Sequence, residues 1–329
     1  MSGPPPPSPA EPAGPDPDRL IESLLERCRF PDADTALVCG VSGGADSLAL
    51  LVLAVAAGCR VTAVHVDHGL RPGSAAEAQV VAAAARRFGA SFRSERVAVG
   101  AGPNLEARAR GARCRVLGPE AATGHTADDQ AETVMVNLLR GAGVSGLAGM
   151  RAGPRHPLLA LRRAETEELC RRMGLDPLQD PTNADPRFVR NRVRHELLPL
   201  CADVAGRDVV PLLARQAGVL AAEADLLDAV ADLIEPEDAA ALASAPEAVG
   251  RRSIRNWLVD AGGHPPPLDA VQRVLEVARN QRLATELPGG RRVGRRQGRL
   301  TVSPGDRGAG APGRGAPVPG RGAPVQSHP

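Results

Sequence analysis

The chain has 329 residues, enough for two domains with sizeable cores, and its 40 lysine and arginine residues are nearly balanced by 38 acidic residues. All 40 are arginines, which excludes catalysis by a lysine Schiff base or a lysine nucleophile of this chain. The six cysteines include no Cys-x-x-Cys pair and no apolar run is long enough to span a membrane, so we expect a cytoplasmic protein with reduced thiols, without zinc, an iron–sulfur cluster or membrane contact.

The first predicted elements surround a glycine-rich loop. Residues 1–17 are proline-rich and predict a disordered N-terminus, whereas the apolar run 36–41 predicts a strand and residues 46–57 a helix. The loop between strand and helix reads Ser42, Gly43, Gly44, Ala45, Asp46 and Ser47. Such a loop aims backbone N–H groups and a helix N-terminus at an anion, and its glycines leave room for a phosphate. The lysine of the kinase and GTPase loop is missing, so we predict another class of phosphate-binding loop, in which Asp46 offers a carboxylate to a metal ion.

Strands and helices continue to alternate through the first half of the chain. Strands are predicted over 61–66, 91–99 and 121–124, and helices over 75–88, 105–117 and 127–140. This order predicts an α/β fold with a doubly wound, mainly parallel sheet covered on both faces. Ligands of such sheets bind at the carboxyl ends of the strands, where Gly124 and the glycine-rich loop are expected to lie.

A cluster of ionisable residues opens the helix predicted over 127–140. His125 and Asp129 are four residues apart and Asp129 and Glu132 three apart, so these side chains share one helix face. Acidic residues in a first helical turn also complement the helix dipole, and this alone explains Asp128 well. It explains the whole cluster beside Gly124 less well, so we predict a functional site here.

The pattern changes after about residue 205. Helices are predicted over 209–234, 246–260 and 268–279, followed by short strands within 283–303. We therefore predict a domain over 18–205, a smaller helix-rich domain over 206–303 and a disordered tail rich in glycine, proline and arginine over 304–329. Residues 282–299 contain six arginines and one acidic residue, which is either a solvated face or a contact with a polyanion.

Several further segments, in order along the chain, are typical of one family. They are His-Val-Asp-His-Gly-Leu-Arg at 65–71, Asn-Leu-Glu-Ala-Arg-Ala-Arg at 104–110, Gly-His-Thr-Ala-Asp-Asp-Gln-Ala-Glu-Thr at 124–133, Leu-Leu-Arg-Gly at 138–141, His-Pro-Leu-Leu at 156–159, Asp-Pro-Thr-Asn at 180–183 and Arg-Asn-Arg-Val-Arg-His at 190–195. With the loop, they resemble the tRNA(Ile)-lysidine synthetase (synthase) family of PP-loop ATP pyrophosphatases. The resemblance is strong over about residues 35–200 and weak at 287–290. His156 departs from it, because the family usually has arginine before Pro-Leu-Leu.

The resemblance implies a ligase that joins free L-lysine to C2 of the wobble cytidine in tRNA(Ile) with a CAU anticodon. ATP first adenylates the C2 oxygen, and lysine then displaces AMP, so the products are lysidine, AMP and pyrophosphate. The implied co-substrate and ion are ATP and Mg²⁺, and the second domain is then a tRNA-binding domain. The oligomeric state is left open, a homodimer being one alternative.

The family also implies roles for the candidate site residues. Residues Ser42–Ser47 and Gly124 would bind ATP, and Asp46 would hold Mg²⁺ and pyrophosphate. Asp129 and Glu132 are expected to capture lysine and accept its proton, since its ammonium has a pKa near 10.4. His125 is expected near the ATP phosphates. Arg187, Arg190 and Arg194 form a basic stripe, from which Arg190 or Arg194 is expected to contact the activated nucleotide. Asn104, Glu106 and Arg110 are equally well explained as a capped helix with a salt bridge.

Two alternative classes of protein share some of these features. Other PP-loop enzymes include cytidine-thiolating tRNA enzymes, which need Cys-x-x-Cys pairs that this chain lacks, and NAD and GMP synthetases, which lack the segments at 125–132 and 190–195. A non-catalytic nucleotide- or RNA-binding module is the second alternative. The intact Asp46 and acidic cluster argue against it.

Overall fold

The computed structural model describes residues 16–67, 74–97, 105–178, 185–259 and 263–304, so the predictions for Asn104, for 68–71, for 180–183 and for most of both tails lie outside the described residues. The chain divides into two compact units, Met1–Ala224 and Asp225–Pro329. This division falls inside helix α10 (Val210–Ala231), not at the predicted boundary of 205/206. The two ends of α10 belong to different units. Near its start, Val210 packs in a core of the first unit, and near its end, Asp228 pairs with Arg252 of the second unit.

A parallel four-stranded sheet organises the first unit, as predicted. Its strands are β1 (Ala36–Gly40), β2 (Arg60–Asp67), β3 (Ser91–Arg96) and β4 (Ala122–Thr123), in the order β3-β2-β1-β4. The chain leaves β1 toward β2 on one side and later returns to pair β4 on its other side. The carboxyl ends of β1 and β4 therefore form the switch point at which such sheets bind ligands. The glycine-rich loop follows β1, and the segment Gly124–Thr126 follows β4, so the two meet there.

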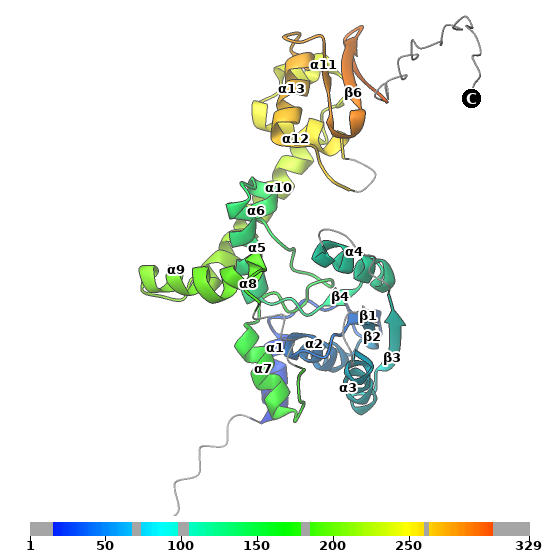
Figure 1. Ribbon diagram of the computed structural model, residues 1–329, viewed down its shortest axis with the longest axis vertical. Coiled ribbons are helices and arrows are strands. Elements are labelled where there is room, and N and C mark those ends of the chain that lie inside the picture. The colour runs from blue at the N-terminus through cyan, green and yellow to red at the C-terminus, as the bar shows by residue number, and fades with distance from the viewer. Residues whose placement is uncertain (1–15, 68–73, 98–104, 179–184, 260–262, 305–329) are drawn as a thin grey trace, which may run out of the picture. The chain divides into compact units, whose positions relative to one another are not determined.

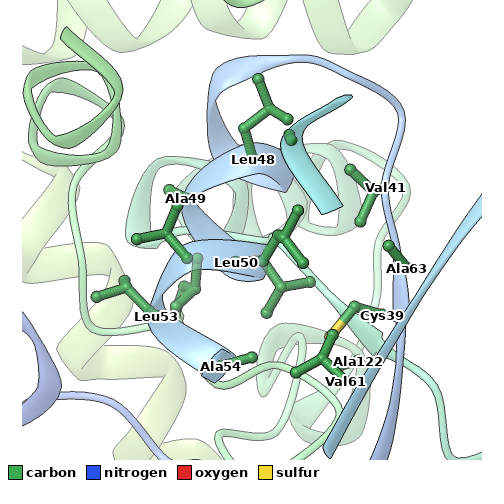
Figure 2. Close-up of a cluster of buried hydrophobic side chains, with 14 of the residues drawn as sticks. Cys39, Val41, Leu48, Ala49, Leu50, Leu53, Ala54, Val61, Ala63 and Ala122 are labelled. Carbon is green, nitrogen blue, oxygen red and sulfur yellow. The ribbon is translucent and has the colours of Figure 1, made fainter. Parts of the chain in front are cut away.

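Helices cover both faces of this sheet (Figure 1). Helices α2 (Ala45–Ala56) and α3 (Ser74–Arg87) pack on one face, and α4 (Leu105–Leu117) packs on the other. Strand residues alternate accordingly, since Cys39 contributes to the core under α2 and Val38 to the core under α4. Figure 2 shows Leu50 and Ala54 of α2 on the side of the helix that faces Cys39, Val61 and Ala63 of the sheet. Because α2 is buried along most of its length, its sequence is apolar on nearly every side.

The rest of the first unit is helical. Its helices are α1 (Pro17–Leu25), α5 (Ala127–Leu139), α6 (Val144–Leu147), α7 (Arg163–Arg172), α8 (Val189–Arg192), the π-helical turn η2 (Val193–Leu197) and α9 (Leu198–Ala205). Helix α1 begins at Pro17 with Asp16 as its N-cap, so the predicted disordered segment 1–17 is wrong at these two positions. An Asp-Pro pair is a helix-start signal, because proline needs no hydrogen-bonding partner in the first turn. Helix α7 packs against α2 through Leu169 and Cys170.

The second unit has its own core and a small antiparallel sheet, in agreement with the predicted helices and short strands. Its elements are α11 (Ala239–Ser244), α12 (Glu247–Trp257), α13 (Leu268–Ala278), β5 (Ala284–Glu286), the short 3-10 helix η3 (Pro288–Gly290), β6 (Arg292–Arg296) and β7 (Arg299–Ser303). The core joins Ile254 and Leu275 of the helices to Val293 and Leu300 of the sheet. None of the helices in the described part of either unit is long and apolar enough to cross a membrane.

Candidate functional site

The buried side chain of Ser47 fixes the backbone conformation of the glycine-rich loop. Its hydroxyl accepts the N–H groups of Ser42 and Gly43, each at 3.2 Å, and donates to the Gly44 carbonyl at 2.8 Å. The N–H groups of Ala45 and Asp46, which follow the N-cap Gly44, bond to no acceptor among the described residues. They are the first groups of α2 and carry the positive end of its dipole. The loop therefore presents backbone donors to an anion, with Ser47 as a structural support.

Gly124 has a packing reason to be glycine. A Cβ atom at this position would overlap the carbonyl of Asp46, which belongs to the first turn of α2. The backbone after β4 therefore touches the backbone of the phosphate-binding loop. This close approach fixes the two chain segments against each other at the switch point of the sheet.

We expect Gly124→Ala to displace the loop and weaken nucleotide binding at least tenfold, since overpacking of this kind costs about 1–3 kcal/mol. Nucleotide titration and the melting temperature measure the effect. Gly143→Ala is the matched control, because Gly143 has an ordinary φ of −81° and open space around its Cβ position. Unchanged nucleotide affinity in Gly124→Ala would contradict the packing role.

Asp46 lies at the start of α2, beside the unpaired N–H groups. It accepts a hydrogen bond from the Thr166 hydroxyl, and the Arg163 Nε lies 3.4 Å from its Oδ2. Burial raises the pKa of Asp46 to about 6, against the hydrogen bond from Thr166, which lowers it. The side chain is still 25% exposed, so an oxygen remains accessible to a cation.

Asp129 and Glu132 form an acidic pair one turn apart on α5. Asp129 accepts the N–H of Thr126 at 2.9 Å and so caps its own helix. Burial alone would raise the pKa of Asp129, but the charges of Arg163 and Arg190 hold it below its ordinary value. Glu132 has only 1% of its side chain exposed, and such a buried carboxylate needs partners.

Three arginines supply these partners, and we call them the arginine trio: Arg163, Arg190 and Arg194. Arg190 Nε donates to Glu132 Oε2 at 2.7 Å, and Arg194 Nε donates to Glu132 Oε1 at 2.6 Å. Together with Asp46 and the acidic pair, the trio makes a cluster of three positive and three negative charges. The structure thus brings together five predicted site residues, the first and last of which, Asp46 and Arg194, lie 148 positions apart in the chain.

A π-helical turn places Arg194. Pro199, in the first turn of α9, has no N–H to continue the helical ladder and would clash with a carbonyl one turn earlier. The turn η2 accommodates it between α8 and α9, and Arg194 lies in this turn. Arg187 does not join the site: it pairs with Asp185 and is 85% exposed. The predicted basic stripe is therefore split, with only its second and third arginines at the site.

The sequence interpretation missed Arg163 and Thr166. Both lie on the first turn of α7 and both contact Asp46. The available signal was their spacing, because 163, 166 and the buried Cys170 follow one another at helical intervals of three and four. Asp128 does not join Asp129 and Glu132, because its carboxylate accepts two hydrogen bonds from the Arg162 guanidinium.

His125 lies beside a second histidine at the end of β4. The Thr123 hydroxyl is 2.7 Å from His125 Nδ1 and 3.0 Å from His156 Nδ1, and the two rings meet edge to face at 5.1 Å. His156, the departure from the family pattern, therefore contacts a predicted site residue. Burial lowers the pKa of His125 to about 4, although the Asp129 charge opposes this shift. His125 is thus neutral at pH 7 and offers a hydrogen bond, not a charge.

This pKa predicts an acid-sensitive stability. Folding disfavours protonation of His125, so its contribution is fully present above pH 6.5 and is lost as the pH falls toward 4. Between pH 7 and pH 5, the wild-type protein should lose about 2 kcal/mol more of its free energy of unfolding than His125→Asn loses. Urea unfolding at the two pH values measures the difference. Equal losses in both proteins would show that His125 ionises normally in the folded state.

A cavity of about 200 Å³ adjoins the charge cluster. Its polar wall includes Glu132, Arg163 and Arg194. Its apolar wall comes from the first turns of α9 and from the residues where α10 begins: Leu198, Pro199, Ala202, Val209 and Val210. A space with one charged and one apolar wall suits a small ligand that has both an ionic group and an aliphatic chain.

Known proteins match the chain over most of its length. A family model for the PP-loop domain matches residues 17–201. The tRNA(Ile)-lysidine synthase of Nocardia farcinica is 43% identical over 296 residues, which are 83% of this chain and 93% of the relative. That of Rhodococcus jostii is 43% identical over 300 residues, covering 84% and 92% of the two chains. That of Thermobifida fusca is 38% identical over 333 aligned positions, covering 92% and 99%. The similarity therefore includes both units.

Proposed function

Because the chain belongs to the tRNA(Ile)-lysidine synthase family, we propose that it converts the wobble cytidine of tRNA(Ile) with a CAU anticodon into lysidine. It consumes ATP and free lysine, passes through an adenylated tRNA and acts in the cytoplasm. The observation that carries this proposal is the cluster at the switch point, where a phosphate-binding loop, three carboxylates and three arginines meet. One half of this cluster suits an anion and the other half suits a cation.

The loop half suits the triphosphate. The unpaired N–H groups of Ala45 and Asp46 would donate to phosphate oxygens. Asp46 fits Mg²⁺, because this ion usually takes one or two protein carboxylates together with phosphate oxygens, and Asp46 keeps an accessible carboxylate next to the loop. When bound, Mg²⁺ would neutralise charge on the pyrophosphate leaving group. Arg190 and Arg194 lie close enough to the acidic pair to serve the activated nucleotide beside it.

The acidic half suits lysine. The acidic pair would hold an ammonium group, and one of its carboxylates would accept the proton that the amine must lose before it attacks C2. The cavity beside Glu132 offers an apolar wall to the four methylene groups of lysine. Attack by the neutral amine forms the carbon–nitrogen bond, and AMP leaves with the electron pair of the broken carbon–oxygen bond.

The test combines two assays on the full chain. ATP–pyrophosphate exchange should require tRNA with a CAU anticodon and proceed without lysine, and lysidine should form when lysine is added. A methionine tRNA carrying the same anticodon is the control for recognition outside the anticodon. Exchange that needs no tRNA would instead favour an enzyme that adenylates a small molecule, as NAD synthetases do.

The second unit is proposed to bind tRNA through its sheet. Arg292 and Arg296 of β6 are exposed and form no ion pair with any carboxylate of the described residues. Arg299 of β7 is instead paired with Glu237 at 2.7 Å. Free guanidinium groups on one strand suit the phosphates of a nucleic acid backbone.

We therefore expect the double variant Arg292→Gln, Arg296→Gln to bind tRNA more weakly and with a shallower salt dependence. Each lost phosphate contact reduces the slope of log K against log salt by about 0.9, so the double variant should lose about 1.8. Filter binding at several salt concentrations measures the slope, and Arg299→Gln is the matched control. A slope equal to that of the wild type would remove this sheet from the tRNA interface.

A further inference from the structure

Only one arginine of the trio joins the acidic pair to the phosphate-binding loop. The Arg163 guanidinium lies 3.2 Å from Asp129 Oδ1, 3.4 Å from Glu132 Oε1 and 3.4 Å from Asp46 Oδ2. Within the described residues, the ion pairs of the other two arginines reach the acidic pair and do not include Asp46. Arg163 is therefore the direct link between the anion-binding half and the cation-binding half of the site.

The fold fixes the backbone of Arg163, whereas its guanidinium group divides its hydrogen bonds among several carboxylates. Its backbone N–H donates to Asp128 Oδ2 at 2.8 Å, and the helix it opens packs on α2 through Leu169. Its contacts with the carboxylates, at 3.2–3.4 Å, are longer than the contacts that the Nε atoms of Arg190 and Arg194 make with Glu132, at 2.6–2.7 Å. Long, divided contacts to three carboxylates are easier to exchange than one short charge-assisted bond.

The charges of this cluster set a condition on lysine binding. With the trio in place the acidic pair is already neutralised, so a lysine ammonium must compete with a guanidinium for the same oxygens. A triphosphate in the loop beside Asp46 would offer Arg163 a stronger partner, because arginine binds phosphate oxygens well. A cation at Asp46 would also repel the Arg163 guanidinium. Attraction to the triphosphate and repulsion by the cation should both act most strongly on Arg163, since only this arginine of the trio contacts Asp46.

We propose that Arg163 is a positioning residue that couples the two substrates: it neutralises the acidic pair in the ligand-free protein, and nucleotide bound at the loop draws it away and opens the pair to lysine. This inference rests on the function proposed above. Because coupling between two sites is reciprocal, lysine should strengthen nucleotide binding by the same factor.

The experiment measures lysine binding by calorimetry with the full chain, in the absence and presence of Mg²⁺ and α,β-methylene-ATP, which cannot be split between its α- and β-phosphates. In the wild type, the nucleotide analogue should tighten lysine binding about tenfold or more, a coupling of about 1.4 kcal/mol. In Arg163→Met, lysine should bind without nucleotide nearly as tightly as it binds the loaded wild type, and the analogue should change its affinity less than twofold. Arg172→Met, on the same helix and paired with Glu168, should keep the wild-type coupling.

Arg163→Lys is a second variant, which keeps the positive charge and is measured in case Arg163→Met does not fold. A single ammonium keeps the charge, but its three donors radiate from one nitrogen and lack the width of the guanidinium fork, so the coupling should be intermediate. Full coupling in Arg163→Met or in both variants would overturn the proposal, as would a wild type that makes lysidine and binds both ligands independently. A wild type that makes no lysidine and binds no lysine would instead refute the proposed function, and this inference with it.

Discussion

Asp46→Asn is expected to reduce AMP and pyrophosphate formation about a thousandfold or more, because the amide removes the negative charge beside the phosphate-binding loop. The fold should survive. Burial already disfavours the ionised form of Asp46 and raises its pKa to about 6, so a neutral amide of the same shape relieves that cost. The amide oxygen can still accept the Thr166 hydroxyl. Release of labelled pyrophosphate and the melting temperature measure the two effects.

Thr166→Val separates the charge of Asp46 from its orientation. This variant removes the hydroxyl that contacts Asp46 and keeps the carboxylate, so its loss of activity should be much smaller than that of Asp46→Asn. Wild-type turnover in Asp46→Asn would remove this residue from the metal and pyrophosphate role. An unfolded Asp46→Asn protein would show that the ion pair with Arg163 holds the fold together.

Amide substitutions in the acidic pair should separate the two steps of the reaction. Glu132→Gln and Asp129→Asn keep the shape and lose the charge that would hold the lysine ammonium. Losing such a pair costs a few kcal/mol, or on the order of a hundredfold in lysine affinity, while adenylated tRNA should still form. Excess lysine should partly rescue Glu132→Gln, whereas Asp129→Asn should recover less if Asp129 accepts the proton. Single-turnover formation of adenylated tRNA and of lysidine, as lysine is varied, measures both steps.

The structure adds a stability effect to this prediction. Glu132 is fully buried among three guanidinium groups, and removing one partner of such a cluster costs about 3–5 kcal/mol. Glu132→Gln should therefore melt well below the wild type, and rescue by lysine must be compared at a temperature where it remains folded. If both variants fail to form the adenylate, the pair serves Mg²⁺ or ATP and the proposed division of roles is wrong.

Local patterns were sufficient for the elements and for most of the residues that the structure brings together at the candidate site. The glycine-rich loop, the alternation of strands and helices, and the acidic residues opening α5 are short-range features, because phosphate binding, sheet pairing and helix capping each depend on a few neighbouring residues. The ends of elements differ by a residue or two from the prediction: the strand predicted over 36–41 ends at Gly40, and Pro17 already belongs to α1. The division between the units was displaced because α10 is one uninterrupted helix, with no break in its pattern.

The sequence by itself determined the family, the sheet and the candidate carboxylates, and only the tertiary structure decided which charges face one another. Arg163 and Thr166 reach Asp46 because α7 packs on α2, a contact between segments more than 100 residues apart. Arg187 and Arg194 look alike along the chain, yet one pairs with Asp185 at the surface and the other with buried Glu132. A long arginine side chain is compatible with solvent or with a site, and its local sequence is the same in both. The choice depends on a buried carboxylate that must be compensated, and that carboxylate comes from a distant helix.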